Sequence, residues 1–419
     1  MQYGCIGEHL GHSFSAEIHA LLADYKYEIC EVAKESLDAF MTARDFCGIN
    51  VTIPYKEAVI PHLYYVDESA KAIGAVNTIV NRCGKLYGYN TDVYGMTALI
   101  NRIGIDMRGK KVAILGTGGT AKTARAVSEL LGAGEIIRVS RRAGDGTVTY
   151  DGLYENHTDV EVIINTTPCG MYPYADGSDE RADTPVDISR FPKLCGVVDA
   201  VYNPLRTNLI LDALGRGIPA EGGLYMLVAQ AVRASEIFLA TTYPSDVCDS
   251  VYKKILQSKE NIVLCGMPSS GKSTVGKILS ERLSMHFTDT DDVIVEMTGR
   301  TIPDIFREDG EGVFRDIEAE AVKNVSALGG YVIATGGGAI LRDENIRRLK
   351  RNGRIFFIDR PLSELMPTSD RPLASDREAI ENRYNERYPR YNAIADIRIA
   401  VDTDADGVAD KIIRESDFK

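Results

Sequence analysis

Two segments of this chain share one local design, in which a short apolar run leads through a glycine-rich turn into a helical pattern. The first begins at Lys110 and reads KKVAILGTGGTAKTARAVSELLGA, and the second begins at Asn261 and reads NIVLCGMPSSGKSTVGKILSERL. An apolar strand that feeds a helix through glycines is typical of a parallel α/β unit that binds a nucleotide at the turn. Because each unit needs its own sheet and core, this 419-residue chain should form at least two α/β domains.

The order of the patterns predicts where these domains lie. Strand and helix patterns alternate ahead of the first turn, so residues 1–104 should form an α/β lobe, followed by a Rossmann-type dinucleotide-binding domain over 105–223. Two helical patterns over 224–258 should complete the first lobe. The second turn should open a P-loop α/β domain with a parallel sheet over 259–419. The junction near residue 259 has no composition typical of a flexible linker.

Charge and cysteine usage exclude several classes of protein. A net charge of -12 disfavours nucleic-acid binding, which depends on basic patches. The eight cysteines form no C-x-x-C pair and the six histidines form no H-E-x-x-H motif, so we expect neither a disulfide framework nor a zinc site. No apolar run approaches the roughly 20 residues of a membrane span, and the N-terminus lacks the pattern of a secretory signal. Reduced thiols in a cytoplasmic protein fit this cysteine usage better.

The second glycine-rich turn, from Gly266 to Ser273, fits the phosphate-binding pattern G-x-x-x-x-G-K-[ST]. Its backbone N–H groups would surround the phosphates, Lys272 would neutralise the β/γ charge, and the Ser273 hydroxyl would ligate Mg²⁺. A nucleoside triphosphate is therefore the expected ligand. The residues expected to bind it are Pro268, Ser269, Ser270, Gly271, Lys272, Ser273 and Thr274.

Several polar motifs follow this turn. They are Asp289-Thr290-Asp291-Asp292, Phe314-Arg315-Asp316-Ile317-Glu318, Ala334-Thr335-Gly336-Gly337-Gly338, Arg371-Pro372-Leu373 and Arg387-Tyr388-Pro389-Arg390-Tyr391. Taken singly, each is as easily a solvated charge cluster or a turn. In this order, however, they resemble the shikimate kinase family over residues 260–419.

The resemblance implies that the domain transfers a phosphoryl group from ATP, with Mg²⁺, to the 3-hydroxyl of shikimate. It implies that Asp291 holds and orients the ring hydroxyls, and that two arginines clamp the carboxylate, as bidentate guanidinium groups suit. The implied residues are Asp291, Arg315, Gly336, Gly337, Gly338 and Arg387 for shikimate, Ser273 and Asp289 for the metal, Lys272 for catalysis, and Arg371 of a closing lid for ATP and catalysis. One departure is that residues 365–370 lack the earlier arginine usual in this lid, which bears on ATP affinity.

The first glycine-rich turn, Gly116-Thr117-Gly118-Gly119-Thr120-Ala121, fits the dinucleotide pattern G-x-G-x-x-G/A. An NAD enzyme would carry an acidic residue after the next strand, to bind the ribose hydroxyls. This chain has Ser140-Arg141-Arg142 there, and arginines would attract a 2′-phosphate, so we expect NADP(H). The alternative is that both arginines simply face solvent.

In the N-terminal lobe, Lys56 and Asp92 stand among small polar residues, and taken alone such a pair could be only structural. The motifs around them are Ser13-Phe14-Ser15, NVTIPYK from Asn50, GAVNT from Gly74, GYNTD from Gly88, NTTP from Asn165, YNP from Tyr202 and MLVAQ from Met226. In this order they resemble the shikimate dehydrogenase family over residues 1–258.

That resemblance implies the roles of a second set of residues. Lys56 would exchange a proton with the ketone or alcohol oxygen, and Asp92 would pair with Lys56 and bind a ring hydroxyl. Ser13, Ser15 and Tyr202 would hold the carboxylate, Asn50, Thr52, Asn77 and Gln230 would complete the polyol network, and Gly223 would lie beside the nicotinamide. Two motifs depart from the family pattern: S-x-S-P ends in Ala16, and N-R-T reads Ser140-Arg141-Arg142.

The two resemblances agree, because the product of the first reaction is the substrate of the second. We therefore expect a bifunctional enzyme that reduces 3-dehydroshikimate to shikimate with NADPH and phosphorylates shikimate with MgATP. Two alternatives stay open at this point. The first half could also use quinate, and the kinase-like half could be weakly active or regulatory. The sequence predicts neither the oligomeric state nor the orientation of the halves.

Overall fold

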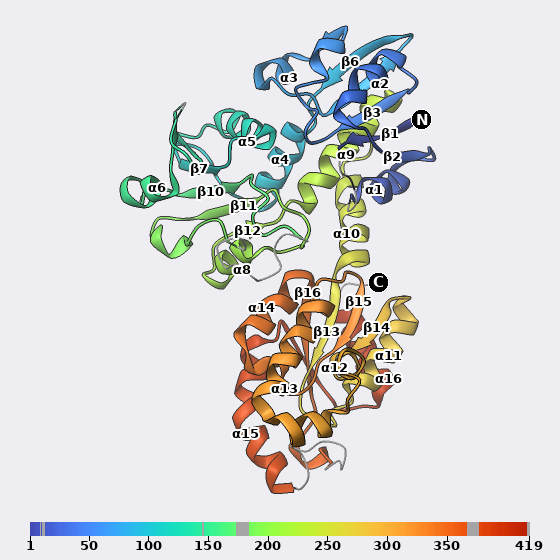
Figure 1. Ribbon diagram of the computed structural model, residues 1–419, viewed down its shortest axis with the longest axis vertical. Coiled ribbons are helices and arrows are strands. Elements are labelled where there is room, and N and C mark those ends of the chain that lie inside the picture. Colours follow the sequence, from blue (N-terminus) through green and yellow to red (C-terminus); the bar gives the residue numbers. More distant parts are fainter. Residues whose placement is uncertain (9, 11–12, 145, 173–183, 367–376, 417–419) are drawn as a thin grey trace. The chain divides into compact units, whose positions relative to one another are not determined.

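The computed structural model describes residues 1–8, 10, 13–144, 146–172, 184–366 and 377–416 (Figure 1). The chain divides into two compact units, Met1–Ile255 and Leu256–Lys419. The first unit holds two six-stranded sheets and the second holds one five-stranded sheet. Helices pack on all three sheets, so the mixed α/β fold class expected from the sequence is confirmed.

The N-terminal lobe is built on a mixed sheet of order β2-β1-β3-β5-β6-β4. Its strands are β1 (Tyr3–Gly7), β2 (Tyr27–Glu31), β3 (Gly48–Val51), β4 (Tyr65–Val66), β5 (Thr78–Arg82) and β6 (Lys85–Tyr89), with helices α1 (Ser15–Leu22), α2 (Leu37–Ala43) and α3 (Glu68–Ile73). β1 is parallel to β2 and β3, whereas β5 and β6 form an antiparallel hairpin. The hairpin is an exception to the expected parallel arrangement, because the two-residue turn Cys83-Gly84 reverses the chain with φ of 51° and 80°.

The second sheet has the order β12-β11-β10-β7-β8-β9, and its neighbouring strands are parallel. Its strands are β7 (Lys111–Leu115), β8 (Glu135–Val139), β9 (Thr147–Val148), β10 (Val162–Asn165), β11 (Gly196–Asp199) and β12 (Ala220–Glu221), with helices α4 (Asp92–Arg102), α5 (Gly119–Leu130), α6 (Tyr150–Asn156) and α8 (Asn208–Gly215). Along β10, Val162 and Ile164 enter one core cluster and Ile163 enters the other, so both faces are covered. This is the doubly wound Rossmann order, whose switch point lies between β7 and β10.

Two further helices, α9 (Leu224–Leu239) and α10 (Val247–Lys259), follow the second sheet. α9 packs against α1 and α4, so it returns to the N-terminal lobe. The start of α10 is tied to the first unit because Tyr252 donates a hydrogen bond of 2.8 Å to Glu221. The boundary between the units, at Ile255, falls inside α10.

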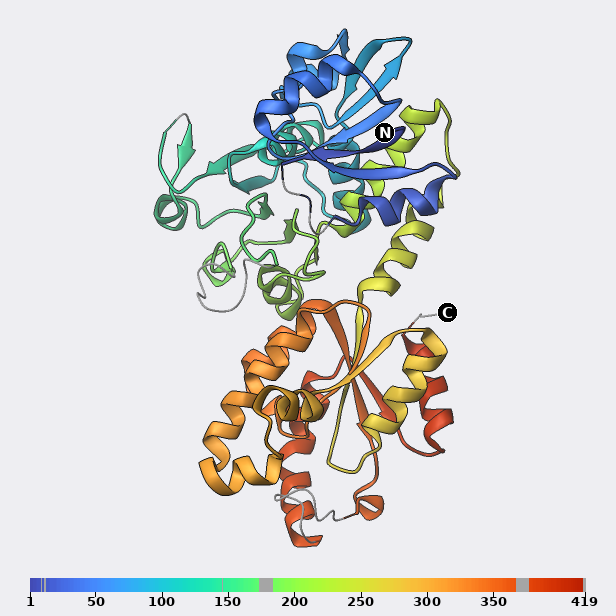
Figure 2. The same cartoon turned by 45° about the vertical axis from the view of Figure 1, so that its right-hand side comes forward.

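The second unit is a parallel sheet of order β14-β15-β13-β16-β17. Its strands are β13 (Asn261–Cys265), β14 (His286–Asp289), β15 (Tyr331–Ala334), β16 (Gly353–Asp359) and β17 (Ile397–Ala400), and its helices are α11 (Lys272–Leu283), α12 (Thr290–Thr298), α13 (Ile302–Ser326), α14 (Asp343–Asn352), α15 (Arg377–Ile394) and α16 (Ala405–Glu415). α11 and α16 pair on one side of the sheet and α13 and α14 on the other (Figure 2). Gly310, with φ of 81°, interrupts α13.

The described residues also form five short 3₁₀ turns: Lys34–Ser36, Ile60–His62, Ile188–Arg190, Ala339–Leu341 and Leu362–Glu364. Within the described ranges, none of the helices is both long and apolar enough to cross a membrane.

Candidate active sites

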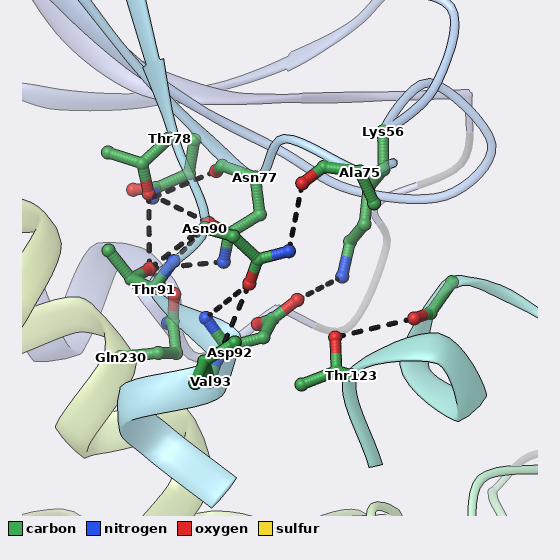
Figure 3. A network of polar contacts seen from close by, with 12 residues as sticks. Lys56, Ala75, Asn77, Thr78, Asn90, Thr91, Asp92, Val93, Thr123 and Gln230 are labelled. Atoms are coloured by element: carbon green, nitrogen blue, oxygen red, sulfur yellow. Dashed lines mark hydrogen bonds and ion pairs between the residues drawn. The ribbon is translucent and has the colours of Figure 1, made fainter. Parts of the chain in front are cut away.

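A lysine–aspartate pair lies at the centre of the first unit's polar residues (Figure 3). Lys56 follows β3 in the loop after Val51, and Asp92 is the first residue of α4. Their Nζ and Oδ2 atoms are 2.6 Å apart, with 15% of the lysine side chain and 10% of the aspartate side chain exposed. A Cβ atom on Gly119 would lie 3.6 Å from Cδ of Lys56, so the dinucleotide turn comes directly beside this pair.

A buried hydrogen-bond network extends from the pair toward α9 (Figure 3). Asn50 donates to the Thr78 hydroxyl at 3.1 Å, and Asn77 accepts from the Thr91 backbone N–H at 2.7 Å. The Thr91 hydroxyl reaches the Gln230 carbonyl oxygen at 3.3 Å. Three predicted polyol residues, Asn50, Asn77 and Gln230, therefore belong to one connected network.

The structure adds residues to this network that the sequence analysis did not select. Asn90 accepts from the backbone N–H of Asp92 at 3.1 Å and donates to the Ala75 carbonyl at 2.9 Å, so it fixes the start of α4. Thr78 and Thr91 link the asparagines. All three lie inside the GAVNT and GYNTD motifs, which is the signal that could have found them. Thr52 is half-buried next to β1, where its Cγ2 lies 2.8 Å from the position that a Cβ of Gly7 would take.

The two serines expected to bind a carboxylate lie together at the start of α1. Ser13 donates to the Ser15 hydroxyl at 3.0 Å, and the intervening Phe14 ring packs on the Tyr202 ring with centroids 5.2 Å apart. Burial raises the pKa of Tyr202 to about 12, so its hydroxyl stays protonated at neutral pH. Two motifs distant in sequence thus meet at one place.

A buried aspartate, Asp199 at the end of β11, orders the loop that carries Tyr202. It accepts hydrogen bonds from Asn165 Nδ2 at 2.9 Å, from the Val201 backbone N–H at 3.0 Å and from the Thr207 hydroxyl at 2.6 Å. Complete burial raises the pKa of Asp199 to about 7.

The dinucleotide turn fits the close approach of a phosphate chain. Gly116 has φ of 110°, and a Cβ there would lie 2.8 Å from the Thr166 hydroxyl. Gly118 and Gly119 open α5, whose N-terminal N–H groups face this turn, and Thr120 and Ala121 continue its first turn.

The polar residues expected at the adenosine end follow β8. Ser140 is half-buried, whereas Arg141 and Arg142 are exposed just beyond the carboxyl end of that strand. Gly223 immediately precedes α9, and a Cβ there would collide with the backbone of Ala200. Its place beside the nicotinamide stays a prediction.

The P-loop of the second unit has the backbone that its glycines predict. Gly266 and Gly271 have φ of 149° and 98°, and Lys272 donates to the carbonyls of Gly266 and Met267 at 3.0 and 2.9 Å. Ser270 is buried in the loop, and its hydroxyl has no hydrogen-bond partner among the described residues, which fits a site built for phosphate oxygens. Pro268 and Ser269 are half-buried in the same loop, and Thr274 is exposed in the first turn of α11.

The expected metal-binding groups are neighbours, because the Ser273 hydroxyl donates to Asp289 at 2.6 Å. Across the described parts of the chain, no three His, Cys, Asp or Glu side chains form a metal cluster. A hydroxyl and one carboxylate fit Mg²⁺, which takes its remaining ligands from phosphates and water. They do not fit a metal held in an all-protein cage.

The predicted acceptor residues converge beside this loop. A Cβ on Gly336 would lie 2.7 Å from Asp291 Oδ1 and 2.9 Å from Glu318 Oε1, and the Arg315 guanidinium lies against Gly338. Arg387 donates to the Gly337 carbonyl at 3.1 Å. A Cβ on Gly337 would meet Pro268 at 3.1 Å, so the acceptor residues and the P-loop are adjacent.

Three residues of this site were not selected from the sequence. Glu318 pairs with Arg315 at 2.8 Å, and burial raises the pKa of its carboxyl. Tyr391 donates to the carbonyls of Gly337 and Gly266 at 2.6 and 3.0 Å, which ties the two loops together. Both lie in quoted motifs.

The third is Arg360, whose Nε donates to the Ser270 carbonyl at 3.3 Å. It gives the P-loop a cation ahead of residues 365–370, the segment whose usual arginine is missing, and no motif marked it. The predicted lid residue, Arg371, lies outside the described residues.

These two sites define the class of the protein: an oxidoreductase of the dinucleotide-binding type joined to a P-loop phosphotransferase. Comparison with known families identifies the family of each unit. The shikimate dehydrogenase substrate binding domain matches residues 5–79, and shikimate kinase matches residues 268–417.

Individual relatives match the first unit. An NADP(+) shikimate dehydrogenase from Clostridium beijerinckii is 37% identical over 267 residues, which cover 60% of this chain and 96% of that protein. The crystal structure of shikimate dehydrogenase 1 from Peptoclostridium difficile is 33% identical with a TM-score of 0.55, covering 61% and 98% of the two chains. That of shikimate 5-dehydrogenase from Thermus thermophilus, in complex with NADP(H) and shikimate, is 25% identical with a TM-score of 0.53, covering 61% and 99%.

The chain therefore belongs to the shikimate dehydrogenase family through its first unit and carries a shikimate kinase domain in its second. Both resemblances drawn from the sequence motifs are confirmed.

Proposed function

We propose that the first unit reduces the ketone of 3-dehydroshikimate to shikimate with NADPH, and that the second unit phosphorylates the 3-hydroxyl of shikimate with MgATP. One feature, present in both units, carries the proposal. In each unit, a nucleotide-binding turn lies against a residue expected to hold the acceptor. Gly119 lies against Lys56 in the first unit, and Pro268 lies against Gly337 in the second.

In the dehydrogenase, Lys56 acts as the general acid. NADPH, when bound, would supply the hydride that the ketone carbon accepts. The Lys56 ammonium donates the proton that the oxygen needs. Asp92, 2.6 Å away, holds the ammonium in place. Arg141 and Arg142 at the end of β8 suit the 2′-phosphate of NADP(H), the cofactor in the names of the relatives above.

In the kinase, the chain's own residues position two substrates for transfer. MgATP supplies the phosphoryl group. Asp291 orients the attacking hydroxyl, Arg315 and Arg387 hold the carboxylate, and Lys272 stabilises the charge on the transferring phosphate. Ser273 and Asp289 would hold Mg²⁺, which would offset the charge of the phosphates. Arg371, the residue predicted to contact ATP from a lid, lies outside the described residues.

We also propose the functional limits of the parts and their compartment. The substrate lobe comprises residues 1–104 and 224–258, the NADP domain 105–223 and the kinase 259–419. All eight cysteines are free thiols, which supports a cytoplasmic location because a reducing compartment keeps them so.

The test measures each activity of the intact chain by itself. NADPH oxidation is followed with 3-dehydroshikimate, NADP⁺ reduction is compared with shikimate and with quinate, and ADP release is followed with shikimate and MgATP. The proposal requires the first and third activities. If the chain oxidised quinate in preference to shikimate, the dehydrogenase substrate would be wrongly assigned. If it bound shikimate and ATP without releasing ADP, the second unit would be a binding module.

A further inference from the structure

A third arginine, Arg383, lies near the two acceptor-site arginines Arg315 and Arg387 and has no part in the function proposed above. It is one helical turn before Arg387 on α15, so the two side chains share a face of that helix. Burial and the nearby charge of Arg387 lower the pKa of Arg383, and Arg315 from α13 adds to this effect. Arg315 and Arg387 thus lie against the Gly336 to Gly338 backbone, and Arg383 lies close enough to interact electrostatically with both.

Each of these arginines has a buried N–H group without an acceptor. The atoms are Nε of Arg315, Nη1 of Arg383 and Nε of Arg387, and none has a hydrogen-bond partner among the described residues. Folded proteins rarely leave buried donors unsatisfied, and charged donors are the most costly to leave so. Three at one place indicate that the site is built to receive an anion.

The carboxylates of the site are distributed unevenly over the three arginines. Arg315 is paired with Glu318 at 2.8 Å and with Glu311 at 2.9 Å, so its charge is largely offset inside the protein. Glu311 and Glu386 lie near Arg383, but both are exposed, and within the described residues Arg383 forms no ion pair with any carboxylate. Unlike Arg315, Arg383 is thus not neutralised by an ion pair among the described residues.

We propose that Arg383 is a third carboxylate-binding arginine of the kinase, and that it makes the site selective for a negatively charged acceptor. Because two glutamates offset part of the charge of Arg315, Arg383 adds to the attraction that Arg315 and Arg387 exert on the acceptor's carboxylate. This inference rests on the kinase activity proposed above and adds a residue that determines its specificity. A bound anion would offset the repulsion between Arg383 and Arg387, a like-charge pair one turn apart on α15.

The test compares a charged and an uncharged acceptor in the intact chain. Kinase rates are measured without nicotinamide cofactor, using shikimate and its carboxamide, in which a neutral amide replaces the carboxylate. The variants are Arg383→Gln, which keeps most of the side chain's length, and Arg383→Lys, which keeps the charge. Arg414→Gln removes one charge from an exposed position on α16 of the same unit and serves as the matched control.

Arg383→Gln should raise the KM for shikimate about 10- to 100-fold, the effect of losing one charge-assisted hydrogen bond, with little change in kcat. The KM for the carboxamide and for ATP should stay near wild type, and Arg383→Lys should recover part of the loss. Equal losses for acid and amide would assign Arg383 a structural role and overturn the proposal, as would a rise confined to the KM for ATP. A wild-type chain unable to phosphorylate shikimate would instead refute the proposed kinase function, before any variant is compared.

Discussion

Replacing Lys56 by methionine should remove the dehydrogenase activity and leave the kinase activity of the same chain intact. Methionine keeps much of the apolar stem, so the change is mainly the loss of the ammonium group. Because Nζ lies 2.6 Å from Asp92 Oδ2 and both side chains are largely buried, no water-filled space separates the pair. The variant therefore tests the proton donor itself.

The substitution should lower both the catalytic rate and the stability of the first unit. Loss of a positioned general acid lowers the rate by about 100- to 10,000-fold, or about 2.7–5.4 kcal/mol in the barrier. The partly buried Asp92 carboxylate also loses its cation, which should reduce the free energy of unfolding of the first unit by about 1–3 kcal/mol. Adding Asp92→Asn should restore much of the stability, since the stranded charge disappears, but none of the activity.

The assay follows NADPH oxidation with 3-dehydroshikimate, ADP release with shikimate and thermal unfolding in the same preparations. The second unit is the internal control for folding and concentration. If the variant reduced 3-dehydroshikimate at a rate within about tenfold of wild type, the role of Lys56 would be refuted, because the loss of rate would be smaller than that expected for an acid–base group. Loss of both activities together would show that the substitution acts through stability.

Three further predictions concern other parts of the two sites. Arg141→Ala should raise the KM for NADPH at least about tenfold, as loss of a charge-assisted phosphate contact does, and leave that for NADH nearly unchanged; equal changes would show that Arg141 does not read the 2′-phosphate. Arg387→Ala should weaken shikimate use by the kinase by about 1.5–3 kcal/mol with the dehydrogenase unaffected, and an unchanged kinase KM would contradict the carboxylate contact. The pKa of Asp199 in the folded protein, about 7, lies above the unfolded value, so its contribution to stability is present at low pH and is lost as the pH rises through about 7. Asp199→Asn should therefore flatten the dependence of Tm on pH between the unfolded value of about 4 and the folded value of about 7, and an unchanged slope would mean that Asp199 is ionised throughout this range.

The parts of the fold that could be predicted from the sequence are those set by local pattern. The strands β7 and β13, the glycine turns after them and the helices α9 and α10 all follow from apolar periodicity and glycine spacing. The β5–β6 hairpin was not foreseen, because a two-residue turn at Cys83 and Gly84 leaves little trace beside the surrounding strand–helix alternation. The unit boundary inside α10 depends on tertiary contacts, which no linker composition marks.

The residues of the candidate sites also fall into two groups, those that a sequence motif marks and those that only the structure reveals. Lys56, Asp92, Arg315 and the P-loop residues stand in motifs whose chemistry is recognisable residue by residue, although their catalytic roles stay predictions. Arg360 and Arg383 carry no motif, and their positions depend on how β16 and α15 approach the glycine-rich loops. Arg360 is found through its hydrogen bond to the P-loop and Arg383 through a buried donor without an acceptor, and both observations require the three-dimensional structure.

The most direct test of the bifunctional assignment is a double-label experiment on the intact chain. The chain is given 3-dehydroshikimate, NADPH deuterated at C4 of the nicotinamide, and MgATP with a labelled γ-phosphate. One product, shikimate 3-phosphate, should carry both the deuterium and the labelled phosphate, whereas Lys272→Ala should stop at deuterated shikimate and Lys56→Met should form neither. Deuterated shikimate as the only product of the wild-type chain, or a phosphorylated product without deuterium, would contradict the account.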